Sequence, residues 1–454
     1  MRARWVRIVA CGVAGVLVPA LSACSSAEPA DSSVTITVAD LPPTTQAKSR
    51  QQFLDQVAAF ERDNPKIKIK PTDSQWEAKT FAARLAGGQL ETVFIVPLTE
   101  PPGLIKRRQV ADITDETRSL PHADKFEERA LKPGTGTDGR IYGLPTSEWA
   151  LGLIYNRQLF TKAGLDPDKP PKTWDEVRVA AKAIFAKTGI PGYAQPTTNN
   201  TGGWTLTAMT YTHGGRAEKE VDGKQVAAFN DGPARRTLEW LKATRWEDNS
   251  IGRQHLRNGA DVLKDFSAGR IGMTIATPST YGDHITKYNG DPAMFGVTAL
   301  PSGGTSATLL GGKMAVVSPK ASTAERAAAV KWIDFRYLRP KYDAAAAEER
   351  AKANAADDIP VGVPAVPFYQ PDVVDPVLKV EHRHANVPLN NFKSYTTGVA
   401  SQDFVAEPPI AGQDIYAALD VAVQAVLTRK DADPAAELRN AEEKVVPILE
   451  RAQR

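Results

Sequence analysis

An alternation of strand-like and helix-like segments near the start of the chain limits most strongly what it can fold into. Residues 34–39 and 67–71 place apolar side chains at every second position, as half-buried strands do. Residues 46–64 and 77–86 instead repeat apolar side chains at helical spacing, and residues 92–96 form a continuous apolar run typical of a strand covered on both faces. The order strand, helix, strand, helix, strand predicts a parallel sheet with flanking helices.

A second series of strands and helices follows Tyr155. Thr173 and Glu176 have the spacing of a capping box and predict the start of a helix that runs to Lys187. Further strands are expected at 271–276, 295–300 and 309–317, and further helices at 203–211, 233–244, 325–338, 414–427 and 433–446. The alanine-rich residues 342–355 are expected to form an exposed helical insertion.

The N-terminus has the pattern of a secretory signal. Arg2, Arg4 and Arg7 precede an uncharged apolar stretch, residues 8–21, which is shorter than the roughly 20 residues that span a bilayer. The following Leu-Ser-Ala-Cys, which ends at Cys24, resembles the lipobox of bacterial lipoproteins. The resemblance implies that residues 1–23 are a signal peptide, that Cys24 is lipidated, and that residues 24–33 tether the protein to the outer face of the cytoplasmic membrane. The alternative is an ordinary signal peptide that happens to contain a cysteine.

The cysteine count then bears on the fold. The chain has two cysteines; Cys11 lies in the predicted signal and Cys24 would carry lipid, so the exported domain has none for a disulfide. It must be stabilised by core burial alone, and because single cores stop growing near roughly 250–300 residues, two lobes are expected. Loss of the three signal arginines lowers the formal charge from +3 to about zero, which favours neither nucleic acid nor an anionic surface as a partner.

Three blocks of the chain carry a family resemblance. GRIYGLPTSEWALGLIYN at 139–156, FSAGRIGMTIATPSTY at 266–281 and FGVTALPSGGTSATLLGGKMAVVSP at 295–319 are similar to the extracellular solute-binding proteins of ABC sugar importers, the maltose-binding-protein-like solute-binding family 1. The resemblance implies an α/β, two-lobed periplasmic-binding-protein-like fold, each lobe a mainly parallel sheet with flanking helices, joined by crossover hinge strands. We expect residues 34–148 and 306–345 in the N-terminal lobe, and residues 149–305 and 346–454 in the C-terminal lobe.

The same resemblance implies a function and its partners. The protein is expected to be a monomeric receptor without enzyme activity or cofactor. Its lobes are expected to close on a carbohydrate ligand, namely an oligosaccharide. It would then deliver this ligand to an ABC permease served by a cytoplasmic ATPase. Sugar rings offer one apolar face and a rim of hydroxyls, so their sites combine flat aromatic rings with polar groups. Strand ends and crossovers are where such a fold places a ligand.

Candidate site residues follow from matching positions. Trp149, Trp204 and Tyr416 match positions that contact sugar in the family, whereas Ser279 replaces a stacking tryptophan and Tyr281 follows two residues later. The loop that starts at Pro97 also departs from its relatives, and both departures suggest a ligand other than maltodextrin. The remaining candidates lie at expected strand ends or crossovers: Asp40, Trp76, Glu148, Gly311, Gly312 and Lys313.

Other interpretations stay open. Trp149, Trp204 and Trp76 could be packing residues, as expected for Trp174, Trp240 and Trp332, and Glu148 and Asp40 could serve caps or turns. The ligand could be a phosphorylated polyol, a polyamine or another small polar solute. A secreted carbohydrate-active enzyme is the alternative from another class. His382 and His384 have no further histidine or cysteine nearby to complete a metal set, and no nucleotide-binding loop is present.

Overall fold

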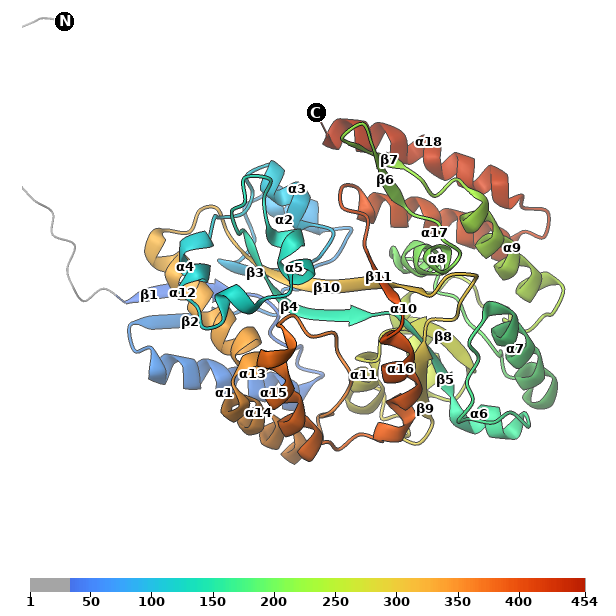
Figure 1. The fold of residues 1–454 in the computed structure, drawn as a ribbon, viewed down its shortest axis with the longest axis horizontal. Coiled ribbons are helices and arrows are strands. Elements are labelled where there is room, and N and C mark those ends of the chain that lie inside the picture. Colours follow the sequence, from blue (N-terminus) through green and yellow to red (C-terminus); the bar gives the residue numbers. More distant parts are fainter. Residues whose placement is uncertain (1–32, 454) are drawn as a thin grey trace, which may run out of the picture.

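The computed structural model describes residues 33–453 and contains two main sheets, each the centre of one lobe (Figure 1). In the first lobe, β1 (Val34–Val38) pairs in parallel with β2 (Ile67–Pro71) and β3 (Val93–Pro97). Helix α1 (Ala47–Asp63) connects β1 to β2, and the short α2 (Phe81–Ala86) connects β2 to β3. The predicted βαβαβ order is confirmed.

Two long strands run between the lobes. Strands β4 (Gly143–Ala150) and β10 (Ala307–Val317) pair antiparallel from Leu310–Ala150 to Val316–Gly143, and Figure 1 shows them crossing the middle of the molecule. Strand β10 also pairs antiparallel with β3 and in parallel with the short β11 (Asp403–Ala406). The first sheet therefore has the order β11-β10-β3-β1-β2, with β4 paired to β10.

The second sheet differs from the expectation of mainly parallel strands. Its central strand β5 (Gly152–Asn156) runs antiparallel to both neighbours, β8 (Met273–Ala276) and β9 (Phe295–Ala299). The alternation of helix and strand along a chain constrains only strands that follow one another. More than 100 residues separate β5 from β8, so sequence order leaves their relative direction undetermined.

Helices cover both sheets. Around the first sheet lie α1, α2, α3 (Pro101–Lys106), α4 (Thr114–Arg118), α5 (Glu128–Leu131), α12 (Thr323–Ile333), α13 (Arg339–Tyr342), α14 (Ala344–Ala356) and α15 (Pro371–Arg383). With the second sheet lie α6 (Arg157–Lys162), α7 (Trp174–Thr188), α8 (Thr201–Thr212), α9 (Gly232–Trp246), α10 (Gly259–Ser267), α11 (Thr280–Thr286), α16 (Lys393–Val399), α17 (Gly412–Thr428) and α18 (Pro434–Ala452). A hairpin of β6 (Glu218–Val221) and β7 (Lys224–Ala227), absent from the sequence prediction, packs on α18.

The contacts of α14 and α15 correct the expected lobe boundary after residue 345. Gln52 on α1 donates a hydrogen bond to Asp357 at 2.7 Å, and Lys48 forms an ion pair with Asp358 at 3.0 Å, so the end of α14 is attached to the first lobe. Helix α15 packs against α13 and α14 on the same side (Figure 1). Ala347 and Ala351 of α14 are buried, so this helix is also not simply an exposed insertion. Alanine-rich surfaces allow such close helix packing, which composition alone does not reveal.

Each lobe has its own buried core. Trp332 packs in the first lobe against Phe53 and Phe60. Trp174 and Trp240 pack edge to face in the second lobe with ring centroids 5.5 Å apart. The packing role predicted for these three tryptophans is confirmed. The capping box of Thr173 and Glu176 at the start of α7 is confirmed as well.

The predicted signal peptide, Cys24 and most of the tether lie outside residues 33–453. Within the described part of the chain, no helix combines the length and the apolar character needed to cross a membrane.

Candidate ligand-binding site

Trp149 lies on the crossing strands, opposite a glycine. Its partner in the β4–β10 ladder is Gly311, and a Cβ atom added to Gly311 would lie only 2.7 Å from the indole Nε1 of Trp149. The missing side chain thus lets the indole lie directly over β10. Trp149 is half-buried, so part of the residue stays exposed to solvent.

Gly312, the next residue of β10, also lies where a side chain would clash with β4. A Cβ atom there would lie 2.5 Å from the carbonyl oxygen of Ser147, so glycine is required by close approach of the two backbones. Lys313, which pairs with Ser147, is exposed. The two glycines and Lys313 are therefore at the crossover, where they were expected, and the glycines shape it through their missing side chains.

Glu148 points to the opposite face of β4 from Trp149, because successive side chains of a strand alternate. Its side chain is fully buried and forms an ion pair with Arg129 of α5 at 3.2 Å. Burial raises the pKa of Glu148 to about 7, although Arg129 opposes the shift. The structure therefore does not bring Glu148 together with Trp149, and the Glu148 carboxylate is engaged within the first lobe.

The second lobe contributes Trp204 at the start of α8. A Cβ atom at the preceding Gly203 would lie 2.1 Å from the Tyr416 carbonyl oxygen, so this glycine lets α8 and α17 pack closely. Trp204 is half-buried, whereas Tyr416 is 1% exposed and its hydroxyl donates to Glu407 at 3.2 Å. The Tyr416 ring is thus part of the core, which differs from the expected stacking role.

Glu407 is a further candidate residue that the sequence did not indicate. It follows β11 directly and lies beside both Tyr416 and Trp204. Burial raises the pKa of Glu407 to about 7, and these two side chains act in the opposite direction. A half-buried carboxyl next to a partly exposed indole is the pairing that a sugar ring requires. Only the position before Pro408 and Pro409, at a strand end, could have drawn attention to it.

The first lobe contributes Asp40 and Trp76, which lie in the segments that follow β1 and β2. Asp40 has a left-handed backbone with φ of 74°, and its N–H donates to the Ser74 carbonyl at 3.0 Å. Trp76 is half-buried and rests on Phe81 with ring centroids 6.3 Å apart. Asp40 and Trp76 line one small recess, together with Arg84.

Glu100 stands beside Trp76 in the loop after β3. Burial raises the pKa of Glu100 to about 7; Arg107 opposes the shift, and Asp414 of the second lobe adds to it. The influence of Asp414 indicates that carboxyl groups from both lobes approach one another here. Glu100 is therefore a second residue of the interlobe region whose role the sequence did not reveal.

Ser279 and Tyr281 differ from each other in exposure. Ser279 is exposed at the start of α11. Tyr281 is 2% exposed and packs edge to face against Phe295 and Phe392. Because α11 turns Tyr281 inward onto the second sheet, its ring does not replace the stacking tryptophan that the family has near Ser279.

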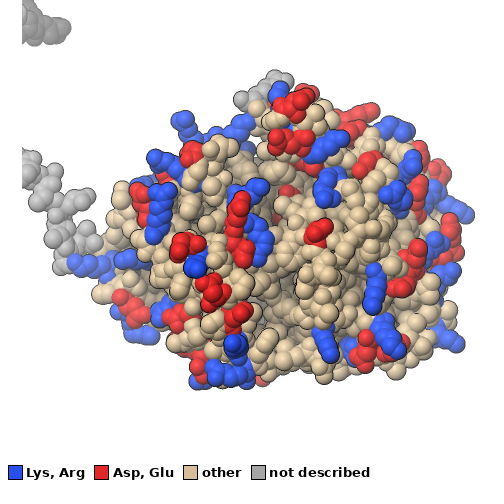
Figure 2. Space-filling view, in the orientation of Figure 1, with Lys and Arg blue, Asp and Glu red and all other residues tan. Residues whose placement is uncertain are grey.

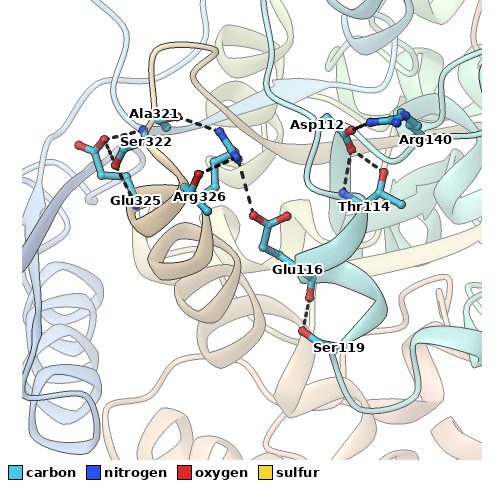
Figure 3. Close-up of polar contacts among 10 residues, drawn as sticks. Asp112, Thr114, Glu116, Ser119, Arg140, Ala321, Ser322, Glu325 and Arg326 are labelled. Atoms are coloured by element: carbon cyan, nitrogen blue, oxygen red, sulfur yellow. Dashed lines mark hydrogen bonds and ion pairs between the residues drawn. The ribbon is translucent and has the colours of Figure 1, made fainter. Parts of the chain in front are cut away.

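A separate hollow of about 840 Å³ lies on the outer surface of the first lobe. Figure 3 shows its ion pairs, Arg140 with Asp112 and Arg326 with Glu116, the latter at 3.6 Å. No aromatic side chain lines it. Two ion pairs within this hollow satisfy much of its charge, so the half-buried indoles Trp149, Trp204 and Trp76 remain the candidates for ligand binding. Figure 2 shows acidic and basic residues interspersed over the face drawn there.

Two α/β lobes joined by crossing strands are the architecture of a two-lobed solute-binding protein. Residues 43–337 match the family model of bacterial extracellular solute-binding proteins, and the chain belongs to this family. The family consists of transporter solute-binding proteins and not of enzymes.

Individual curated relatives match this chain at low sequence identity. A probable amino-acid ABC transporter periplasmic-binding protein of Sinorhizobium fredii is 27% identical over 176 residues, 38% of this chain and 40% of that protein. The matched segment thus spans less than half of that relative.

Solved structures are similar over nearly the whole chain. A solute-binding protein from Thermotoga lettingae bound to α-D-tagatose has a TM-score of 0.74 and 21% identity, covering 92% of this chain and 100% of the other. UgpB from Mycobacterium tuberculosis with glycerophosphocholine has a TM-score of 0.72 and 16% identity, covering 93% and 99%. These similarities confirm the two-lobed fold.

Proposed function

We propose that this protein is a lipid-anchored receptor that captures an oligosaccharide between its lobes and delivers it to an ABC permease. The observation that carries the proposal is the half-buried indole of Trp149 lying over Gly311 on the crossing strands. Trp204 and Trp76 add an indole from each lobe, and Glu407 and Glu100 stand beside them as partners for hydroxyl groups. Rings of this kind bind the apolar face of a sugar, and carboxyls bind its rim.

A phosphorylated polyol is the second candidate, because a structural neighbour binds glycerophosphocholine. Such a ligand requires cations that are free to bind phosphate. Arg84, beside the Trp76 recess, is instead paired with Glu91 at 3.4 Å, while Lys313 is exposed at the crossover. The groups near the three indoles are predominantly carboxyls, which supports a neutral ligand over an anionic one.

Calorimetric titration with neutral oligosaccharides, polyols and glycerophosphodiesters tests the ligand class. We expect binding of an oligosaccharide, and Trp149→Ala should weaken it by roughly 2 kcal/mol, about thirtyfold. Trp246→Ala is the matched control, because Trp246 is also half-buried but donates to the Val426 carbonyl within the second lobe. Binding of glycerophosphodiesters alone would favour the second candidate. Equal oligosaccharide affinities of the two variants would show that Trp149 packs within the protein and does not contact the ligand.

The lipid anchor has its own test. Metabolic labelling with a fatty acid should mark the wild type and not Cys24→Ala, which should be released from the membrane, because two acyl chains are needed for a stable anchor. Labelling of the variant, or no labelling of the wild type, would reject lipidation at Cys24 without affecting the ligand proposal.

A further inference from the structure

The loop after β3 touches the first turn of α17 across the lobe boundary. Gln413 Nε2 donates to Thr99 Oγ1 at 2.9 Å. A Cβ atom at the neighbouring Gly412 would lie 2.7 Å from Cγ2 of Thr99, so the glycine allows this approach. Thr99 is 6% exposed. Nearby, Lys106 Nζ of α3 donates to the Ala452 carbonyl of α18 at 2.5 Å.

Gln413 is held in position by its own lobe. Asn200 Nδ2 donates to Gln413 Oε1 at 2.9 Å and to the Gln413 carbonyl at 3.1 Å. With its oxygen occupied, the amide of Gln413 presents its NH₂ group to Thr99. Asn200 precedes α8, which carries Trp204 in its first turn. The interlobe hydrogen bond is thus connected to the helix that presents the second-lobe indole.

We propose that Asn200, Gln413 and Thr99 form a latch that holds the lobes together by direct protein contact and sets how long a bound ligand is retained. The inference rests on the proposed receptor function. A ligand shifts the balance between open and closed lobes only by its preference for the closed state. Contacts made by the protein itself favour closure whether or not ligand is bound, and they slow the opening that releases it.

Charge at the same boundary makes the latch sensitive to pH. Glu100 of the loop is near Arg107 and Trp76 of its own lobe and near Asp414 of α17, and Asp414 is itself near Arg451 of α18. Glu100 follows Thr99 and Asp414 follows Gln413, so the hydrogen bond between Gln413 and Thr99 brings the two carboxyls toward one another. In this arrangement burial raises the pKa of Glu100 to about 7, and Asp414 adds to the shift. The closed form therefore binds protons more tightly than the open form. Closure is favoured at low pH and weakens as pH rises through about 7.

Fluorescent labels on the two lobes of the chain, read out by energy transfer without ligand, test the latch. Thr99→Val and Gln413→Ala should each shift the closed-to-open ratio toward open by about three- to tenfold, as expected for loss of one hydrogen bond. Gln51→Ala is the control, because exposed Gln51 donates a hydrogen bond to Asp55 within α1, away from the latch residues. Glu100→Gln should flatten the change of the ratio between pH 6 and pH 8.

Ligand release is the second readout. For a neutral oligosaccharide that binds in the calorimetric titration, both latch variants should raise the dissociation rate about as much as they shift the lobe ratio, with melting temperatures close to that of the control. Unchanged energy transfer and dissociation in Thr99→Val and Gln413→Ala would overturn the latch. Failure of sugars to bind, with the lobe ratio still shifted by both variants, would reject the proposed ligand and leave the latch in place.

Discussion

Trp149 and Gly311 face each other across the β4–β10 ladder, so closely that the indole occupies the space of a missing side chain. A single residue without a Cβ atom therefore sets the position of the ring most central to the proposed site. The crossing strands serve both as the connection between the lobes and as part of the proposed binding surface.

Gly311→Ala should displace the Trp149 ring. The new Cβ atom would start 2.7 Å from the indole nitrogen, and overpacking of this kind costs about 1–3 kcal/mol of stability. Ligand affinity should fall at least tenfold, measured by calorimetric titration beside urea unfolding. Gly232→Ala is the control, since a Cβ atom there meets only the end of the flexible Arg236 side chain at 3.4 Å. Unchanged ligand affinity in Gly311→Ala would show that binding does not depend on the position of the Trp149 ring.

Glu148→Gln should alter the pH dependence of stability. The folded protein holds the pKa of Glu148 at about 7, above the ordinary value of 4.5, so the folded state binds the proton more tightly than the unfolded state. The free energy of unfolding should accordingly fall as pH rises from about 4.5 to about 7, by up to roughly 3 kcal/mol from this group. Urea titrations at pH 4.5, 6 and 8 should show a smaller fall in the variant. Parallel pH profiles would contradict the assignment.

Asp420→Ala should loosen the contact between α8 and α17. The two carboxylate oxygens of Asp420 accept hydrogen bonds from the backbone N–H groups of Gly203 at 2.8 Å and Asn200 at 2.7 Å. Because Asp420 is 6% exposed, its removal leaves two N–H groups with poor access to water and should cost about 2–4 kcal/mol. Thermal unfolding measures the loss. Asp420→Asn keeps one acceptor and should lose less; equal losses would argue that volume, not hydrogen bonding, is decisive.

Local sequence patterns correctly predicted those helices and strands whose formation depends only on residues that are close together in the chain. The capping box of Thr173 and Glu176 needs only neighbours along the chain, and the structure confirms it. Alternating apolar residues likewise predicted β1 and β2. The β6–β7 hairpin and β11 were missed because their strands are only four residues long and show no buried alternation.

The candidate site residues were likewise predicted only in part from the sequence. Trp149 and Trp204 are half-buried near the lobe boundary, and their ligand role stays a prediction. Tyr281 and Tyr416 carry the same sequence signal, an aromatic ring near a helix start, yet both are buried. Which way such a ring turns depends on the sheet or helix packed against it, and no local pattern contains that information.

The sequence by itself determined the βαβαβ order, the family, and the crossover segments that contain Trp149 and Gly311, because these depend on local periodicity and on matching blocks of residues. Tertiary structure alone decided that Glu148 turns to Arg129 and that Gln413 meets Thr99, more than 300 residues away in the chain. Burial and hydrogen bonding between segments that are separated in the chain depend on how the elements pack. Because their free energy arises only on packing, these contacts produce no periodic pattern in the sequence from which they could be predicted.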